Sequence, residues 1–525
     1  MVKVFTLLVF FFSSFIVTAQ TRVLVSAPLN TKGGQEFSPS ISGDGKTMVF
    51  LSKLGDGLDT EFMISYLRSG AWSKPELLTS INTPIKTIYT GDLSISHDGN
   101  TIVYTSGKYG GIGGSDIVMT EKKGNVWQAA SNLGKPINTT GQEGDASLSP
   151  DNKYLYFVRY TASKTPNGLP CGKIYKAEQI AGTNTWKEPV ALAAPINQTC
   201  ECNPRIAADG RTLYFASMRA GGKGGYDQYF AKQNIDGSWT TPKALTLINT
   251  PADNRYMAIS AQGTTVFYTV DEKGLIDIAT TMLPADLQPD KVIYWKGLVK
   301  DATSQKILPA RIVITDKKTN KLNIIQCNTD GSFNVFLPQG NTYDVAVQSN
   351  EKGKLYYSTL FELDALDKYK EIEQNITLKP IAPQASIVLS NIGFESGTAT
   401  LTPFSTPELN RIVSFLKDNP TARIEIGAHT YKVIEDSIKA ADLTEVRTDT
   451  LQTITDDSTG IVSYQLKTTY SNDRTKKQAN AIADYITAKG IPASRFTYKG
   501  YGDKEPLQPT PADPLLNRRV VLKIM

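Results

Sequence analysis

An internal repeat of about 55 residues constrains the fold of this chain more than any other feature, and it extends over residues 36–282. Each copy contains two alternating apolar segments joined by a tight turn, as in residues 40–50 around Asp44-Gly45. Gly accepts the positive φ that such a turn requires, so Asp-Gly between apolar segments predicts a β-hairpin. The turns of the five copies are centred on Asp44, Asp98, Asp151, Asp209 and Gln262.

Two further landmarks recur within the repeat. A Gly-rich turn precedes a strand at residues 110–117 and 221–227, and in four copies a Trp is followed by an Asn-containing turn. Four strands per copy are typical of propeller blades, and the copies resemble the TolB-like propeller repeat. The fifth copy lacks the Asn ending, whereas a matching ending at residues 27–31 precedes the first copy. Residues 22–31 are therefore expected to supply the outer strand of the last blade, which predicts five blades, with six as the alternative.

The repeated Asp and Gly residues have two interpretations. Carboxylates such as Asp44 and Asp116 could bind calcium, and Gly-rich turns also occur around phosphates. Repetition once per copy favours turn chemistry, because the same geometric need arises in every blade. We therefore predict no metal ion and no cofactor, and we interpret the Trp series as blade core.

The first nineteen residues have the pattern of a secretory signal peptide. Lys3 supplies positive charge, residues 4–17 are apolar, and small residues up to Ala19 offer a cleavage site. The apolar run is too short for a membrane span. The chain is therefore expected to be exported by means of a signal peptide that is cleaved after Ala19. Export and a formal net charge of +5 over 525 residues argue against nucleic-acid binding.

The chain contains four cysteines, Cys171, Cys200, Cys202 and Cys327. In an oxidising compartment a disulfide from Cys171 to Cys200 or to Cys202 is expected, since the three lie in one repeat region. A metal site is the weaker interpretation. Cys200 and Cys202 are separated by a single residue, and neither histidine of the chain is near them.

Residues 291–381 differ in character from the repeat. Short alternating segments at 296–301, 310–316, 329–335 and 340–347 are separated by turns, which predicts a small β-sandwich. The sequence Asp-Gly-Ser-Phe at 330–333 and the pair Gly340 and Tyr343 resemble the carboxypeptidase regulatory-like fold. That resemblance implies a spacer or a protein-contact module.

Residues 384–525 carry a series of motifs in a fixed order. They comprise residues 391–403, 424–430, 479–486, 500–503 and 517–520. Taken together, they resemble the C-terminal domain of the OmpA-like family. The resemblance implies an α/β module that binds peptidoglycan in the periplasm. It assigns this binding to Thr430, Tyr431, Arg474, Gln478, Asn517 and Arg518.

Two of these positions depart from the family pattern. Tyr431 stands where the family has an Asp that pairs with the ammonium group of diaminopimelate, and Gln478 stands where it has an Arg that grips the peptide-stem carboxylate. Each charge-assisted contact is worth about 1.5–3 kcal/mol, so losing both would weaken binding by powers of ten. Arg474, one helical turn earlier, is the candidate substitute. An insert at residues 432–470 alternates like a hairpin that could cover the groove.

The sequence offers little support for catalysis. The chain has two histidines, His97 and His429, and it contains neither a Gly-x-Ser-x-Gly elbow nor a zinc-binding His pair. His97 is expected to be an exposed turn residue. We therefore predict that the protein is not an enzyme, and a carboxylate-only glycosidase is the enzymatic alternative.

The predicted order of domains is a signal peptide at 1–19, a propeller at 20–288, a sandwich at 291–381 and an OmpA-like domain at 384–525. This order resembles multidomain periplasmic OmpA-like proteins of Bacteroidetes, including PorE-type envelope subunits of the type IX secretion and gliding apparatus. It implies a protein of the periplasm that is associated with the outer membrane or cell wall, and that binds peptidoglycan or is derived from a peptidoglycan anchor. Its propeller would contact outer-membrane or periplasmic proteins. The alternative is a propeller that binds a glycan or a small ligand, with the C-terminal fold reduced to a structural cap.

Overall fold

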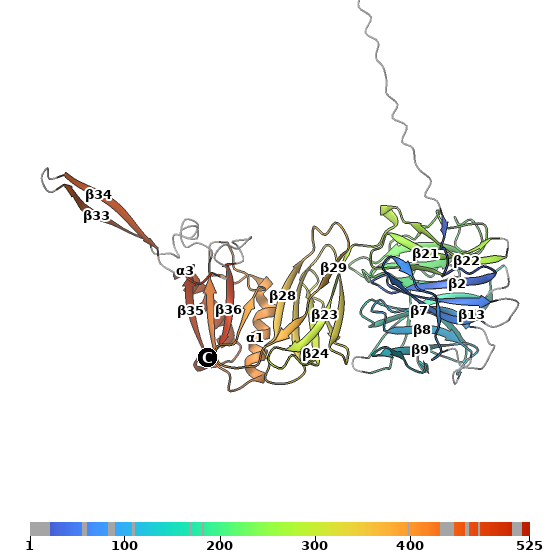
Figure 1. Ribbon diagram of the computed structural model, residues 1–525, viewed down its shortest axis with the longest axis horizontal. Helices are drawn as coiled ribbons and strands as arrows, with labels where there is room; N and C mark the ends of the chain where they lie inside the picture. The colour runs from blue at the N-terminus through green and yellow to red at the C-terminus, as the bar shows by residue number, and fades with distance from the viewer. Residues whose placement is uncertain are drawn as a thin grey trace, which may run out of the picture. The chain divides into compact units, whose positions relative to one another are not determined.

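The structure is a computed structural model, in which the chain is mainly β and divides into two compact units, residues 1–290 and 291–525 (Figure 1). The predicted signal peptide and Tyr431 lie outside the residues that the structure describes. The described residues are 22–54, 60–81, 90–107, 111–166, 168, 170–180, 183–272, 274–396, 398–430, 446–456, 461–470, 473–506 and 517–525.

The N-terminal unit contains five antiparallel sheets, and each is built around three strands that follow one another along the chain. The first two sheets consist of β2 (Gly34–Ile41), β3 (Thr47–Leu54), β4 (Glu61–Arg68), β5 (Ala71–Trp72) and β6 (Glu76–Leu77), and of β7 (Thr90–Ile95), β8 (Thr101–Ser106), β9 (Asp116–Lys123), β10 (Val126–Trp127) and β11 (Ser131–Asn132). The next two consist of β12 (Gln142–Leu148), β13 (Tyr154–Lys164), β14 (Pro170–Glu178) and β15 (Val190–Ala191), and of β16 (Glu201–Ile206), β17 (Thr212–Ser217), β18 (Asp227–Lys232) and β19 (Lys243–Ala244).

The fifth sheet joins the two ends of this unit. Its strands β20 (Met257–Ile259), β21 (Thr265–Glu272) and β22 (Leu275–Met282) are followed in strand order by β1 (Val23–Leu24). Val23 is paired with Thr280, and the side chain of Asn30 exchanges two hydrogen bonds with the backbone of Ile278 at 2.8 and 3.0 Å. The segment at 22–31 thus supplies the outer strand that the repeat pattern predicts for the last copy.

The recurring Asn residues act as substitutes for a strand. The amide of Asn138 accepts from the backbone N–H of Ile117 and donates to its carbonyl, both at 2.8 Å. Asn197 makes the same pair of bonds with Ile174, and Asn249 makes it with Gln228. Because a carboxamide has a donor and an acceptor side by side, one side chain satisfies both backbone groups at the end of a short sheet.

The repeated carboxylates accept hydrogen bonds from residues of their own turns. The Ser42 hydroxyl donates to Asp44 at 2.6 Å, and Gly45 adopts a φ of +72°. In the Gly-rich turns, Asp116 accepts from the N–H of Ile112, and Asp227 accepts from Lys223, both at 2.6 Å. Within the described ranges, no group of three or more His, Cys, Asp or Glu residues could hold a metal ion.

The structure selects one of the two disulfides that the sequence left open, and it corrects the expected exposure of His97. Cys171 and Cys200 form a disulfide, and Cys202 is a buried free cysteine. His97 was expected to be exposed, but its side chain is half-buried, and burial lowers its pKa to about 4. Its turn packs against the neighbouring sheet, since the His97 carbonyl accepts from the N–H of Gly43 at 2.8 Å.

The C-terminal unit begins with two four-stranded sheets around one core that includes the fully buried Trp295. One sheet consists of β23 (Val292–Asp301), β26 (Ser332–Pro338), β29 (Lys370–Glu373) and β30 (Ile376–Leu378), and the other of β24 (Ala310–Asp316), β25 (Leu322–Gln326), β27 (Thr342–Ser349) and β28 (Tyr357–Glu362). The sequence did not predict β25, β28 or β29.

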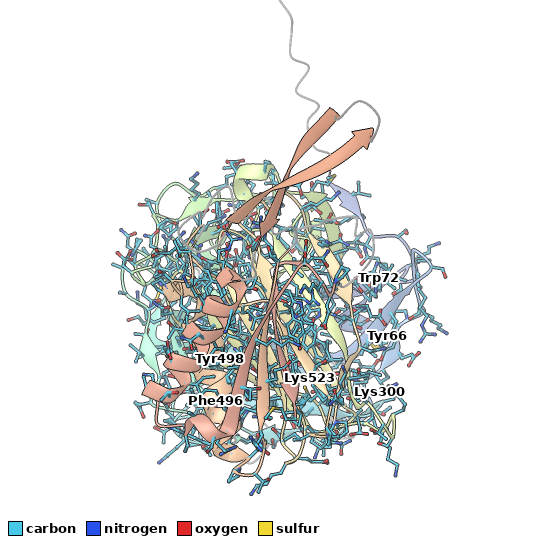
Figure 2. All side chains as sticks on the ribbon, turned by 90° about the vertical axis from the view of Figure 1, so that its left-hand side faces the viewer. Tyr66, Trp72, Lys300, Phe496, Tyr498 and Lys523 are labelled. Carbon is cyan, nitrogen blue, oxygen red and sulfur yellow. A yellow bond between two sulfur atoms is a disulfide. The ribbon has the colours of Figure 1, made fainter. Side chains whose placement is uncertain are left out.

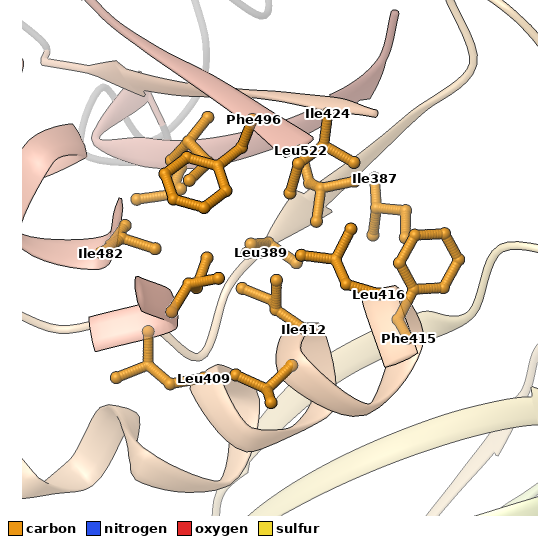
Figure 3. Close-up of a cluster of buried hydrophobic side chains, with 14 of the residues drawn as sticks. Ile387, Leu389, Leu409, Ile412, Phe415, Leu416, Ile424, Ile482, Phe496 and Leu522 are labelled. Carbon is orange, nitrogen blue, oxygen red and sulfur yellow. The ribbon is translucent and has the colours of Figure 1, made fainter. Parts of the chain in front are cut away.

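The rest of the unit is a four-stranded sheet with two helices. The strand order is β31 (Ser386–Leu389), β36 (Arg519–Ile524), β32 (Ile424–His429) and β35 (Phe496–Gly502), with β32 and β35 parallel. The helices are α1 (Thr406–Asp418) and α3 (Asp473–Ala488), and the short 3₁₀ helices η2 (Pro403–Ser405) and η3 (Ala493–Arg495) also lie here. A further 3₁₀ helix, η1 (Ala285–Leu287), belongs to the N-terminal unit. In the sequence, apolar residues at helical spacing predict helices at 408–418 and 475–489. The apolar faces of the two observed helices meet the sheet in one core (Figure 3).

Alternation decides which side chains of the sheet enter this core. On β35, Phe496 is 8% exposed and lies in the core, whereas Tyr498 is 42% exposed (Figure 2). The insert forms β33 (Val446–Asp456) and β34 (Ile461–Tyr470), which make a two-stranded antiparallel sheet of their own. No helix in the described part of the chain has the length and hydropathy of a membrane span.

Helix α1 is also tied to the preceding sandwich by buried polar contacts. Arg411 reaches Asp344 of β27 at 2.5 Å between Nη2 and Oδ1, and it contacts Glu408 through Nη1. The Tyr356 hydroxyl donates to Glu408 at 2.7 Å. The side chains of Asp344 and Glu408 are completely buried, so the arginine is what compensates their charge.

Candidate functional site

The clearest pocket of the α/β sheet lies where β32 and the first turn of α3 meet the start of β36. It is a cavity of about 210 Å³. Its lining includes His429 and Thr430 from the end of β32, Arg474 and Gln478 from α3, and Arg518 and Arg519 before and on β36, with Glu395 from the loop after β31.

The helix presents its pocket residues because of spacing and close backbone packing. Arg474 and Gln478 are four residues apart, so they share one helical face. A Cβ at Gly500 would lie 2.4 Å from the backbone nitrogen of Lys476, so glycine allows β35 to approach the first turn of α3. The Thr475 hydroxyl accepts from the N–H of Gly502 at 3.2 Å. These contacts fix the position from which Arg474 enters the pocket.

The side chain of Gln478 makes a neutral hydrogen bond to the backbone at the edge of the pocket. Its Nε2 donates to the carbonyl of Thr398 at 2.9 Å, and thereby holds the loop that also supplies Glu395. The amide is half-buried. The position that carries a carboxylate-gripping Arg in the family pattern therefore stabilises the pocket rim here.

His429, which lines the pocket, belongs to an aromatic stack. The rings of His429 and Tyr501 are parallel within 3° at 4.6 Å between centroids, and the Tyr501 hydroxyl donates to Glu425 at 2.6 Å. A Cβ at Gly427 would lie 2.8 Å from the Tyr501 ring, so the stack requires glycine there. Burial, and then the nearby Arg519, lower the pKa of His429 to about 4. His429 is therefore neutral at pH 7 and contributes polarity without charge.

The charge of the pocket is positive. Three arginines line it, against the single glutamate Glu395 in the described lining. Arg474 and Arg518 both line this cavity, and burial, followed by the charge of Arg518, lowers the pKa of Arg474. Arginine remains charged despite such shifts. Arg519 is oriented by a hydrogen bond from Nη2 to the carbonyl of Glu505 at 2.7 Å. The geometry suits an anion with two oxygen atoms, such as a carboxylate.

The structure brings most of the residues predicted for this site together. Thr430, Arg474, Gln478 and Arg518 all line the pocket, and Tyr431 lies outside the described residues. Asn517 is buried beside Arg518, and its carbonyl accepts from Arg519 at 3.3 Å. Sequence reasoning missed His429, Arg519 and Glu395. The first two are members of motifs already recognised, so their motif membership was the available signal.

Comparison with known proteins identifies the C-terminal part of the chain. The model of the OmpA family matches residues 393–515. The C-terminal part of the chain thus carries an OmpA family domain. The matched residues include most of the pocket lining described above, whereas Arg518 and Arg519 follow the match. Domains of this family generally bind peptidoglycan. A comparison with curated proteins finds no match.

Several solved structures are similar to parts of the chain at low identity. The OmpA-like domain of FopA1 from Francisella tularensis is 17% identical, covers 27% of this chain and 79% of its own, and has a TM-score of 0.17. A MotB-like protein from Desulfovibrio vulgaris is 19% identical, covers 25% of this chain and 68% of its own, and has a TM-score of 0.17. An endo-arabinase from Bacteroides thetaiotaomicron is 14% identical, covers 48% of this chain and 94% of its own, and has a TM-score of 0.34.

Proposed function

We propose that this protein is a non-catalytic, exported component of the cell envelope whose OmpA domain binds a carboxylate of the peptidoglycan peptide stem through Arg474. The observation that carries the proposal is the position of Arg474 in the positive pocket at the end of β32, on the same helical face as Gln478. Gln478 is engaged with the loop carbonyl of Thr398. A guanidinium one turn earlier can replace the missing family arginine, because both positions lie over the same cavity.

For the N-terminal unit we propose a five-bladed propeller at residues 20–288. Five successive sheets and the contribution of β1 to the last of them support this arrangement. Further support comes from contacts between first strands of different sheets, such as Ser38 of β2 with Asp92 of β7, and Asn203 of β16 with the same Asp92. Such contacts are expected where blades surround a common axis.

The intermediate sandwich, residues 291–381, is proposed to be a carboxypeptidase regulatory-like spacer between the propeller and an OmpA domain at 384–525. In this architecture the wall-binding domain holds the protein in the periplasm, and the propeller offers its surface to outer-membrane or periplasmic proteins. An assembly for type IX secretion or gliding is the proposed context, on the basis of the domain order alone.

Co-sedimentation of the mature chain with purified peptidoglycan sacculi tests the wall-binding role. Arg474→Gln is expected to lower the affinity at least about tenfold, because a charge-assisted contact is worth about 1.5–3 kcal/mol. The matched control is Arg423→Gln, which changes an exposed arginine at the opposite end of β32 and should leave binding unchanged. Equal losses in both variants, or binding by neither variant nor the natural chain, would contradict the proposal.

A gain-of-function variant separates loss of binding from loss of fold. Tyr431→Asp combined with Gln478→Arg restores the two residues of the family pattern. If the natural chain binds through Arg474, the double variant should bind more tightly and Arg474→Gln should weaken it less. If the natural chain does not bind and the double variant does, the domain has kept its fold for protein contacts.

A further inference from the structure

The first strands of the sheets in the N-terminal unit share an irregularity that directs side chains to one place. The pairing of β2, β7, β12 and β16 with the next strand shifts register within each strand. Residues inside these shifts, and one residue just before β20, have left-handed backbone conformations, which L-residues rarely adopt. They are Ser38 (φ +52°), Asp145 (φ +51°), Asn203 (φ +48°) and Tyr256 (φ +61°).

The side chains that meet there form a continuous polar cluster. Asp92 accepts from Ser38 at 2.5 Å, from Arg205 at 2.5 Å and from Asn203 at 3.2 Å. Asp145 accepts from the Tyr160 hydroxyl at 2.6 Å and from the Asn203 N–H at 3.2 Å. Asp92 is 1% exposed and Asp145 is 6% exposed. Burial, and then the charge of Asp92, raise the pKa of Asp145 to about 6.

Arg255 differs from Arg205 and Arg219, the buried arginines of this unit. Arg205 pairs with Asp92, and Arg219 donates to Ser217 and to backbone carbonyls. The half-buried Arg255 lies over the rings of Tyr226 at 5.7 Å and Tyr256 at 5.3 Å. Its guanidinium group has no hydrogen bond or ion pair with any residue in the described part of the chain. Burial disfavours the charge of this group, whereas the nearby side chains of Tyr256, Cys202 and Asp145 favour it, and the net effect raises the pKa of Arg255.

A guanidinium in this state lacks partners that its chemistry requires. It has five N–H donors in a plane, and a planar anion with two oxygen atoms satisfies two of them at once. The partial burial of this group beside two tyrosine rings strengthens a charge-assisted bond to it, because fewer water molecules compete for its donors. Tyrosine rings also offer flat surfaces to the ring or backbone of an organic ligand.

We propose that Arg255, between Tyr226 and Tyr256, binds a small organic carboxylate where the first strands of the five sheets meet. The two available sources share this chemistry: an acidic sugar, and the C-terminal carboxylate of a short peptide. The site is separate from the pocket of the OmpA domain, and its ligand need not be peptidoglycan.

Isothermal titration calorimetry on the full mature chain tests this site. The probes are D-galacturonate and triglycine, with D-galactose and triglycine amide as matched compounds that lack the carboxylate. One carboxylate probe is expected to bind saturably with a Kd below about 10 mM, and its matched compound is expected not to bind. Binding of galacturonate alone assigns an acidic sugar, and binding of triglycine alone assigns a peptide terminus.

Two substitutions and one control locate the binding. Arg255→Gln should weaken binding of the carboxylate probe about tenfold or more, and Arg255→Lys should also weaken it, because an ammonium keeps the charge but loses the two-pronged geometry. The control is Arg68→Gln, which changes an exposed arginine over the ring of Tyr66 at 5.5 Å. If Arg255→Gln fails to fold, the Arg255→Lys result decides. The proposal is overturned if neither probe binds, if the compounds that lack the carboxylate bind equally well, or if folded Arg255 variants bind like the natural chain.

Discussion

Replacement of Arg411 by methionine tests whether a buried charge bridge joins the sandwich to the OmpA domain. Arg411 contacts two carboxylates, Asp344 and Glu408, whose side chains are completely buried, and it is itself 6% exposed. Arg411→Met removes the cation and leaves both acids without it. Each charge-assisted bond is worth about 1.5–3 kcal/mol, and breaking a buried pair from one side costs about 3–5 kcal/mol. We expect α1 and β27 to open about 3–5 kcal/mol more easily.

Hydrogen exchange followed by mass spectrometry on the full chain measures this opening locally. Peptides from α1 and β27 should lose protection together, while peptides from the N-terminal unit should not change. The control Arg423→Met alters an exposed arginine of the same domain and should change protection by less than about 0.5 kcal/mol.

The stability defect of Arg411→Met should depend on pH in a definite direction. Without Arg411 the two buried carboxylates should have raised pKa values, so the folded variant binds more protons than the unfolded chain does. The defect should therefore shrink as the pH falls from 7 towards 5. A triple variant that also carries Asp344→Asn and Glu408→Gln should recover much of the protection. A loss below about 1 kcal/mol in Arg411→Met would refute the reasoning.

Two further predictions concern histidine titration and the Asn series. Burial lowers the pKa of both His97 and His429 to about 4, so the ¹³C-labelled histidine signals should not shift between pH 8 and pH 5, whereas the chain unfolded in urea should titrate near pH 6.5. As the pH falls, the unfolded chain binds protons at these histidines before the folded chain does. The histidine contribution to stability is therefore complete above pH 6.5 and is lost as the pH falls to about 4. A titration midpoint above pH 6 for either histidine of the folded chain would contradict this. Asn197→Ala removes bonds to the N–H and carbonyl of Ile174 and to the carbonyl of Leu192, and it should destabilise the N-terminal unit by about 2–3 kcal/mol in urea unfolding. The exposed Asn234→Ala is the control, and an equal effect of the two changes would count against the strand-substitute role.

Local pattern was sufficient for much of the secondary structure. The Asp-Gly turns, the Asn endings and the helices α1 and α3 lie where periodicity and turn chemistry predict them. These signals depend on neighbouring residues, so they can be read from a short window. The strands β25, β28 and β29 were missed because their alternation is weak, and they are held by pairing with β24, β27 and β23.

The candidate site was predicted in part for the same reason. Thr430, Arg474, Gln478 and Arg518 came from ordered motifs, and they line one cavity. The pairing of Gln478 with Thr398 involves residues 80 positions apart, and no local pattern specifies it. The neutral state of His429 likewise depends on burial and on Arg519, which are properties of the assembled sheet.

The sequence by itself determined the repeat, the turns, the helix faces and the order of the C-terminal motifs, because these follow from residue type and spacing. Tertiary structure alone decided which polar groups meet. Asp92 and Arg205 are separated by 113 positions, and Asp344 and Arg411 by 67, yet each pair is buried in one contact. Burial removes water as an alternative partner, so the energy of such groups depends on what the fold places beside them. The position of Arg255 over the rings of Tyr226 and Tyr256 is visible for the same reason only in the folded chain.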